Sequence, residues 1–171
     1  MVRLAAILFS TILVHACGGG EHTEAPTQKQ VNKDMETVNR QLAIEERAQI
    51  DGFIERRGWT MSETGTGLRY MIYENGNGEL AKTGQRAEVN YRVSLINGTE
   101  IYSSDANGSK EFTIGQDNVE SGLHEGILLM KPGDKAIFIL PSHLAHGLMG
   151  DNNKIPPRSS VVYDIELLAL K

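Results

Sequence analysis

Histidine is the residue type in this chain best suited to chemistry near neutral pH, and three of the five histidines fall in its second half. His143 and His146 are three residues apart, and His124 lies earlier. Neutral imidazole is a common zinc ligand, but no Asp, Glu or Cys ligand set accompanies these residues at fixed spacing, so we expect no metal site. The chain also lacks GxSxG, P-loop, GxGxxG and HExxH patterns, so hydrolase, nucleotide-binding and zinc-protease functions have no support. We expect no cofactor.

The single cysteine, Cys17, is the second candidate for chemistry. It follows Val14-His15-Ala16, and residues 4–14 form an apolar run that is too short for a membrane-spanning helix of about 20 residues. The four residues that end in Cys17 resemble a bacterial lipobox, whose cysteine is lipidated after cleavage. We therefore predict a lipoprotein signal peptide over residues 1–16, a lipid anchor at Cys17, and a place in the cell envelope, at the outer membrane facing the periplasm. The alternative is an incidental cysteine near an ordinary cleavage site.

Composition limits the remaining possibilities. The 171 residues, 40% hydrophobic and 23% charged, are enough for one globular domain with appendages. The formal net charge is −5 and no stretch concentrates Lys or Arg, which argues against nucleic-acid binding because that binding is largely electrostatic.

A tether and a helix precede the domain. Residues 17–30, which begin with the lipidated cysteine, contain no aliphatic side chain larger than Ala and predict a flexible tether. Residues 31–58 predict an amphipathic helix that ends at Arg56-Arg57-Gly58, with cations and then glycine at the C-terminal cap. Its apolar stripe consists of Val31, Met35, Val38, Leu42, Ile50, Phe53 and Ile54. The stripe could cover the following domain, pair with a second copy in a dimer, or hold a client.

Beyond residue 65 the patterns are those of β-strands separated by turns. Residues 87–96 alternate apolar and polar positions, and Asn97-Gly98 is the strongest short signal for a hairpin to residues 99–102. Further strands are predicted over residues 67–73, 112–114, 136–140 and 161–170, and a short helix over residues 119–130. The predicted fold class is α+β, an antiparallel sheet with one short helix against its face.

Four segments of this region carry short motifs in a fixed order. They are Val89-Asn90-Tyr91-Arg92-Val93 with Asn97-Gly98-Thr99; Ile101-Tyr102-Ser103-Ser104; Gly122-Leu123-His124-Glu125-Gly126 with Met130-Lys131-Pro132-Gly133; and Pro141, Ala145, His146 and Gly147 with Ile155-Pro156-Pro157. Together with the last strand, these motifs resemble the FKBP-type peptidyl-prolyl cis–trans isomerases over residues 65–171. More narrowly, Gly122-Leu123, Leu129-Met130-Lys131 and residues 150–155 are similar to gliding-motility-associated FKBP-type lipoproteins of Bacteroidetes, which the predicted anchor and helix also fit.

The resemblance implies an FKBP-like fold and prolyl isomerase activity on proline-containing polypeptide clients of the envelope. Isomerisation breaks no covalent bond, but the peptide bond must rotate over a barrier of about 18–20 kcal/mol. The twisted amide has lost its resonance and is less charge-separated, so an apolar environment favours it. Such a catalyst needs an apolar cup for the proline ring and donors for the flanking carbonyls.

The same resemblance implies the residues of the site. The expected cup consists of Tyr91, Ile101, Phe112, Val119, Leu123, Ile155 and Tyr163, with Tyr102 beside Ile101 on the wall. Glu120 would bind a client carbonyl through its backbone N–H, and His146 would hydrogen-bond the same peptide. Three positions depart from the family pattern: Leu123 replaces a Trp, Tyr102 replaces a carboxylate, and His146 replaces a Tyr. We therefore expect an active but weakened isomerase. The alternatives are a non-catalytic chaperone or binding module and a structural component of an envelope complex.

Overall fold

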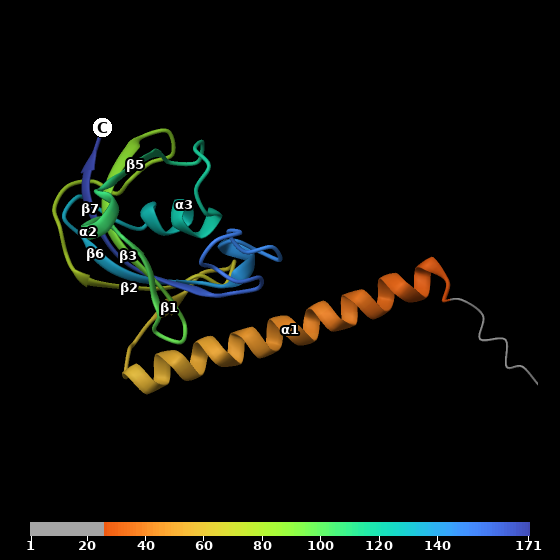
Figure 1. Ribbon diagram of the computed structural model, residues 1–171. Helices are drawn as coiled ribbons and strands as arrows, with labels where there is room; N and C mark the ends of the chain where they lie inside the picture. Colours follow the sequence, from red (N-terminus) through yellow and green to blue (C-terminus); the bar gives the residue numbers. More distant parts are fainter. Residues whose placement is uncertain (1–25) are drawn as a thin grey trace, which may run out of the picture. The chain divides into compact units, whose positions relative to one another are not determined.

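The computed structural model describes residues 26–171 (Figure 1). The predicted signal peptide, Cys17 and most of the predicted tether lie outside the described residues. The chain divides into two units between Glu36 and Thr37, inside the first helix, and the whole sheet belongs to the second unit. Within residues 26–171, no helix combines the length and the apolar character needed to cross a membrane.

The second unit contains one antiparallel sheet. Its strands follow the order β1-β2-β6-β7-β3-β4. β5 pairs with residues 86–89 of β3, which β4 does not pair with. The elements are α1 (Gln28–Arg57), β1 (Ser62–Glu63), β2 (Arg69–Glu74), β3 (Arg86–Leu95), β4 (Glu100–Ser103), α2 (Ser104–Asn107), β5 (Lys110–Thr113), α3 (Ser121–Ile127), β6 (Lys135–Leu140), the 3-10 turn η1 (Ser142–Leu144) and β7 (Val161–Leu170). The predicted fold class, with its preceding helix, is confirmed. α1 begins three residues earlier than predicted, and β1, α2 and η1 were not predicted because elements of two to four residues carry no periodicity.

The inner face of the sheet packs against α3 (Figure 1). Two glycines bring this helix close to β6. A Cβ at Gly126 would lie 2.5 Å from Cε2 of Phe138, and a Cβ at Gly122 would lie 2.6 Å from Cγ of Leu140. Any side chain at either position would push α3 off the sheet, so the pair of glycines sets how deeply Leu123 enters the core.

The outer face of the sheet is covered by the second half of α1. Ile50 and Phe53 are buried there in a cluster with Ile137, Ile139 and Val162. Neighbouring positions on β6 point to opposite faces, so Ala136, Phe138 and Leu140 belong to the inner core. The uninterrupted apolar run of β6 therefore reflects a strand that is buried on both faces.

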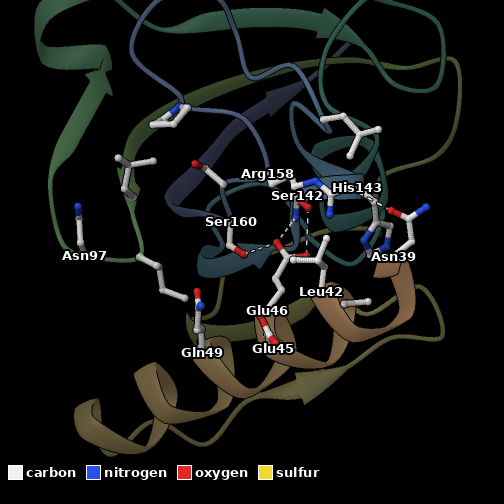
Figure 2. Close-up of a pocket in the computed structure, with 16 residues that line it drawn as sticks. Asn39, Leu42, Glu45, Glu46, Gln49, Asn97, Ser142, His143, Arg158 and Ser160 are labelled. Carbon is white, nitrogen blue, oxygen red and sulfur yellow. Dashed lines mark hydrogen bonds between the residues drawn. The ribbon is translucent and has the colours of Figure 1, made fainter. Parts of the chain in front are cut away.

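Two features fix α1 to the sheet. Gly58, at φ 64°, ends the helix, and the N–H of Trp59 returns to the carbonyl of Ile54 at 3.2 Å. Earlier in the helix, the Glu46 carboxylate accepts hydrogen bonds from the backbone N–H of Ser142 (2.7 Å) and from the hydroxyls of Ser142 (3.0 Å) and Ser160 (2.6 Å) (Figure 2). Glu46 thus holds both ends of the loop that joins β6 to β7.

Candidate functional site

A cavity of about 240 Å³ lies between α3 and the inner face of the sheet. We call it the cup. Its lining consists of Val89, Tyr91 and Val93 from β3, Tyr102 from β4, Lys110 from β5, Glu120 and Leu123 at α3, His146 from the loop before β7, and Tyr163 and Ile165 from β7. Strands distant in sequence therefore meet the start of a helix at one hollow, and this hollow is mainly apolar with a few polar groups.

The floor of the cup is aliphatic. Leu123 is 1% exposed and packs among the buried residues of the inner core, including Val89 and Ile165. Leu123 provides apolar surface at the position where a flat aromatic ring was expected from the family pattern. The floor is therefore apolar but carries no flat aromatic ring.

A carboxylate stands inside the cup. Glu120 directly precedes α3, and its side chain is 11% exposed. The Tyr163 hydroxyl donates to Glu120 Oε1 at 2.8 Å, and His146 Nε2 lies 2.9 Å from the same oxygen. Burial, followed by the charge and the hydrogen bond of Glu120, raises the pKa of Tyr163 well above its ordinary value. The phenol therefore stays protonated and serves as a donor.

The wall beside the cup is held by a second carboxylate. Asp151 Oδ1 accepts the backbone N–H groups of Ile155 (2.7 Å) and Asn153 (2.9 Å), and Asp151 Oδ2 accepts the hydroxyl of Tyr102. Burial raises the pKa of Asp151, but these hydrogen bonds outweigh it and lower the pKa to about 2. Asp151 thus places a carboxylate against Tyr102, and the contact ties the loop to β4.

The structure places the predicted site residues in two groups. Six of them line the cup: Tyr91, Tyr102, Glu120, Leu123, His146 and Tyr163. Four others do not line it but pack into the core around it: Ile101, Phe112 and Ile155 are buried, and Val119 is half-buried. Phe112 also meets the His124 ring edge-on, with ring centroids 5.7 Å apart. These four residues shape the core around the cup, and the direct roles expected for them stay predictions.

Sequence reasoning missed several members of the site. Val89 and Val93 share a face of β3 with Tyr91, so their alternation could have placed them in the lining. Ile165 carried the same signal on β7. Lys110 carried no signal, because only the pairing of β5 with β3 brings it to the cup.

The three histidines of the second half have separate partners. His124 Nδ1 accepts the N–H of Gly115 at 2.9 Å, and its Nε2 lies 2.9 Å from the carbonyl of Asp117. His143 Nε2 lies 3.0 Å from the carbonyl of Thr66, and His146 faces Glu120. No group of three or more potential metal ligands occurs in the described part of the chain. Two of these rings brace turns, and one belongs to the cup.

A larger hollow of about 500 Å³ lies between α1 and the loop that joins β6 to β7 (Figure 2). We call it the groove. Leu42, Ile96, Leu148 and Pro156 give it apolar surface, while Glu46, Ser142 and Ser160 are engaged with one another across it. Glu46, Ser142 and Ser160 hold the helix to the loop, and none of the predicted site residues lines the groove. The cup is therefore the better candidate for chemistry.

The sequence comparison identifies the family. Residues 77–168, more than half of the chain, match the family of FKBP-type peptidyl-prolyl cis-trans isomerases. The chain therefore belongs to the FKBP-type peptidyl-prolyl cis–trans isomerase family, and the family predicted from the motifs is confirmed.

Individual relatives agree with this assignment. The FKBP-type peptidyl-prolyl cis-trans isomerase FkpA of Buchnera aphidicola subsp. Schizaphis graminum is 38% identical over 140 residues, which cover 81% of this chain and 54% of that protein. FkpA of Escherichia coli strain K12 is 36% identical over 119 residues, which cover 70% of this chain and 43% of that protein. The chain thus spans about half the length of the curated relatives that it matches.

Solved structures show the same fold. The crystal structure of FkpA from Escherichia coli has a TM-score of 0.63 at 28% identity, covering 85% of this chain and 74% of that one. The crystal structure of AtFKBP13 has a TM-score of 0.63 at 31% identity, covering 66% of this chain and all of that one.

Proposed function

We propose that this protein catalyses cis–trans isomerisation of Xaa-Pro bonds in polypeptide clients. The observation that carries the proposal is the cup, an apolar hollow of about 240 Å³ with hydrogen-bonding groups on one side. Uncatalysed cis–trans exchange of an Xaa-Pro bond takes tens to hundreds of seconds. A site that favours the twisted amide therefore accelerates a slow reaction.

Each part of the cup has a task in this chemistry. Val89, Leu123 and Ile165 offer the proline ring a dry surface, which favours the less charge-separated twisted amide. The backbone N–H of Glu120 has no acceptor within residues 26–171, so it is available to a client carbonyl. His146 stands on the same side as a second hydrogen-bonding group. Holding the flanking carbonyls while the Xaa-Pro peptide bond rotates lowers the barrier to isomerisation without any covalent step.

The test is the rate of cis-to-trans exchange of a short Xaa-Pro peptide. We expect acceleration by the purified protein and a loss of at least about tenfold in kcat/KM for Tyr91→Ala, which removes a wall of the cup. Tyr73→Ala is the matched control, because Tyr73 is 48% exposed, lies outside the cup and bonds Asp164. Exchange at the uncatalysed rate for all three proteins would reject the enzyme.

We also propose that the protein works in the cell envelope, anchored by lipid at Cys17, on envelope proteins connected with gliding motility. Support comes from the lipobox-like residues that end in Cys17 and from the motifs around Gly122-Leu123. Incorporation of labelled palmitate that disappears in Cys17→Ala tests the anchor. Normal surface motility after deletion of the gene would reject the link to gliding.

A second activity, holding unfolded clients, is favoured by the apolar surface that α1 and the loop leave open. Val38 and Ile44 on α1 are each 56% exposed, and Leu148 and Met149 on the loop are 64% and 71% exposed. The same helical surface is a candidate for pairing two copies. Suppression of client aggregation that survives Tyr91→Ala but is lost in a Val38→Ser, Ile44→Ser variant would support this activity.

A further inference from the structure

One oxygen atom in the cup has no partner. Among residues 26–171, every buried side-chain nitrogen or oxygen has a hydrogen-bond partner except Glu120 Oε2. The other oxygen of the same carboxylate has two partners, the hydroxyl of Tyr163 and Nε2 of His146. The Glu120 side chain is therefore held in place through Oε1, while Oε2 lacks a hydrogen-bond donor among the described residues.

Such an acceptor is costly in a folded protein. A buried polar atom without a partner loses its hydration and gains nothing in return, and the loss is greater for a charged group. Native structures contain few of these atoms, and a functional role is one of the reasons for which such an atom persists. Glu120 lines the cup while Oε2 itself is buried, so we expect the donor that completes its hydrogen bonding to arrive with a client and to reach Oε2 by displacing a neighbouring side chain.

The charges around the cup indicate which client group this is. Asp151, on the neighbouring loop, already accepts three hydrogen bonds, so its charge is compensated. Lys110 also lines the cup, but it makes no ion pair with Glu120. Tyr163 and His146 both contact Oε1 of Glu120 and not Oε2. Glu120 Oε2 therefore remains as an acceptor with negative charge.

We propose that Glu120 is a specificity-determining residue that selects client segments carrying a basic side chain next to the proline. The inference rests on the proposed isomerase function and deepens it. An ammonium or guanidinium group beside the proline supplies the donor that Oε2 needs and neutralises the carboxylate in a site with little water. An acidic neighbour meets a like charge instead, so the same residue also excludes clients.

The experiment compares peptides that differ only beside the proline. Series with Lys, Leu or Glu immediately before the proline, and a second set with the same residues immediately after it, are assayed for kcat/KM. At about pH 8, where an ordinary imidazole is neutral, we expect Lys to exceed Glu by about tenfold in at least one series, with Leu between them. The Glu120→Gln variant keeps the shape of the side chain and removes its charge, so we expect the Lys and Glu peptides to converge.

The matched control is Glu125→Gln on α3, the helix that Glu120 directly precedes. It also removes one negative charge, but from a side chain that accepts the hydroxyl of Thr66 and does not line the cup. This variant keeps the preference if the proposal is correct. Equal kcat/KM for all peptides in an active protein, or a preference unchanged in Glu120→Gln, overturns the proposal while leaving the isomerase intact. Absence of acceleration for every peptide rejects the isomerase itself.

Discussion

The two faces of the sheet are both apolar, yet they differ in what covers them. The outer face is closed by α1, whose Ile50 and Phe53 complete a small cluster with β6 and β7. The inner face carries the larger core and α3, but α3 has only 7 residues and leaves the cup open beside it. β7 therefore contributes to both sides, because Val162 belongs to the outer cluster whereas Tyr163 and Ile165 line the cup.

The difference shows how the two functions of the sheet are separated. Polar groups near the outer face, such as Glu46, are satisfied by neighbouring side chains and backbone. The inner face keeps one unsatisfied acceptor, Glu120 Oε2. The Glu46 carboxylate is therefore fully engaged in hydrogen bonds, whereas a buried carboxylate oxygen beside the cup has no partner among the described residues.

The largest effect that tests this comparison is expected from Phe53→Ala on the outer face. Phe53 is 5% exposed and its ring contacts Trp59 edge-on at 5.8 Å. Its truncation should lower the free energy of unfolding by about 3 kcal/mol, because it removes buried apolar surface and leaves a cavity. Urea unfolding measures this loss. Isomerase kcat/KM per folded molecule should be unchanged, and a large fall there would show that the two faces are coupled.

An intermediate effect is expected from Glu46→Ala. Glu46 connects the helix on the outer face with the loop that carries His146 to the cup. The variant leaves the N–H of Ser142 and the buried hydroxyl of Ser160 without their acceptor, at a cost of about 1–3 kcal/mol. Because Glu46 holds both ends of the loop that delivers His146, kcat/KM should also fall severalfold. Glu45→Ala is the control, since Glu45 is exposed, lines the same groove and accepts a hydrogen bond from Gln41 of its own helix. Equal losses of stability and of kcat/KM in the two variants would contradict the role of Glu46 in holding the loop.

The smallest effect is expected from Asp151→Asn, and it depends on pH. The folded pKa of Asp151 is about 2 and the ordinary value is 3.8, so the carboxylate stabilises the fold above about pH 4 and this contribution disappears as the pH falls through 2. The variant should therefore lose less stability than the wild type between about pH 4 and pH 2. Urea unfolding across this range, with Asp105→Asn at an exposed ion pair as control, measures the difference. If the free energy of unfolding changes equally with pH in the wild type and in Asp151→Asn, the prediction is wrong.

Much of the fold can be predicted from local patterns. The alternation along β3 and the turn at Asn97-Gly98, where Gly98 has φ 91°, predicted a hairpin that the structure contains. The cap at Gly58 predicted the end of α1. The stripe of α1 was only partly interpretable, because Ile50 and Phe53 are buried whereas Val38 is exposed. Helical periodicity shows which residues share a face but not how far along the helix a partner extends.

The site was less accessible to sequence reasoning. Family motifs brought six of the ten expected residues to the cup, but the hydrogen bonds among Glu120, Tyr163 and His146 join segments that no local pattern connects. The same holds for Asp151, which places a carboxylate beside Tyr102 from 49 residues away. Replacements of this kind become visible only when the chain is folded.

The Glu46 contact also bears on how the gene can be divided and recombined. A recombinant fragment that starts at residue 65, where the family motifs begin, would retain every residue lining the cup. It would lack the acceptor for Ser142 and Ser160 and would expose Ile137, Ile139 and Val162 to water. The second half of α1 therefore cannot be exchanged as an independent module, and a fragment meant to retain the native packing has to include it.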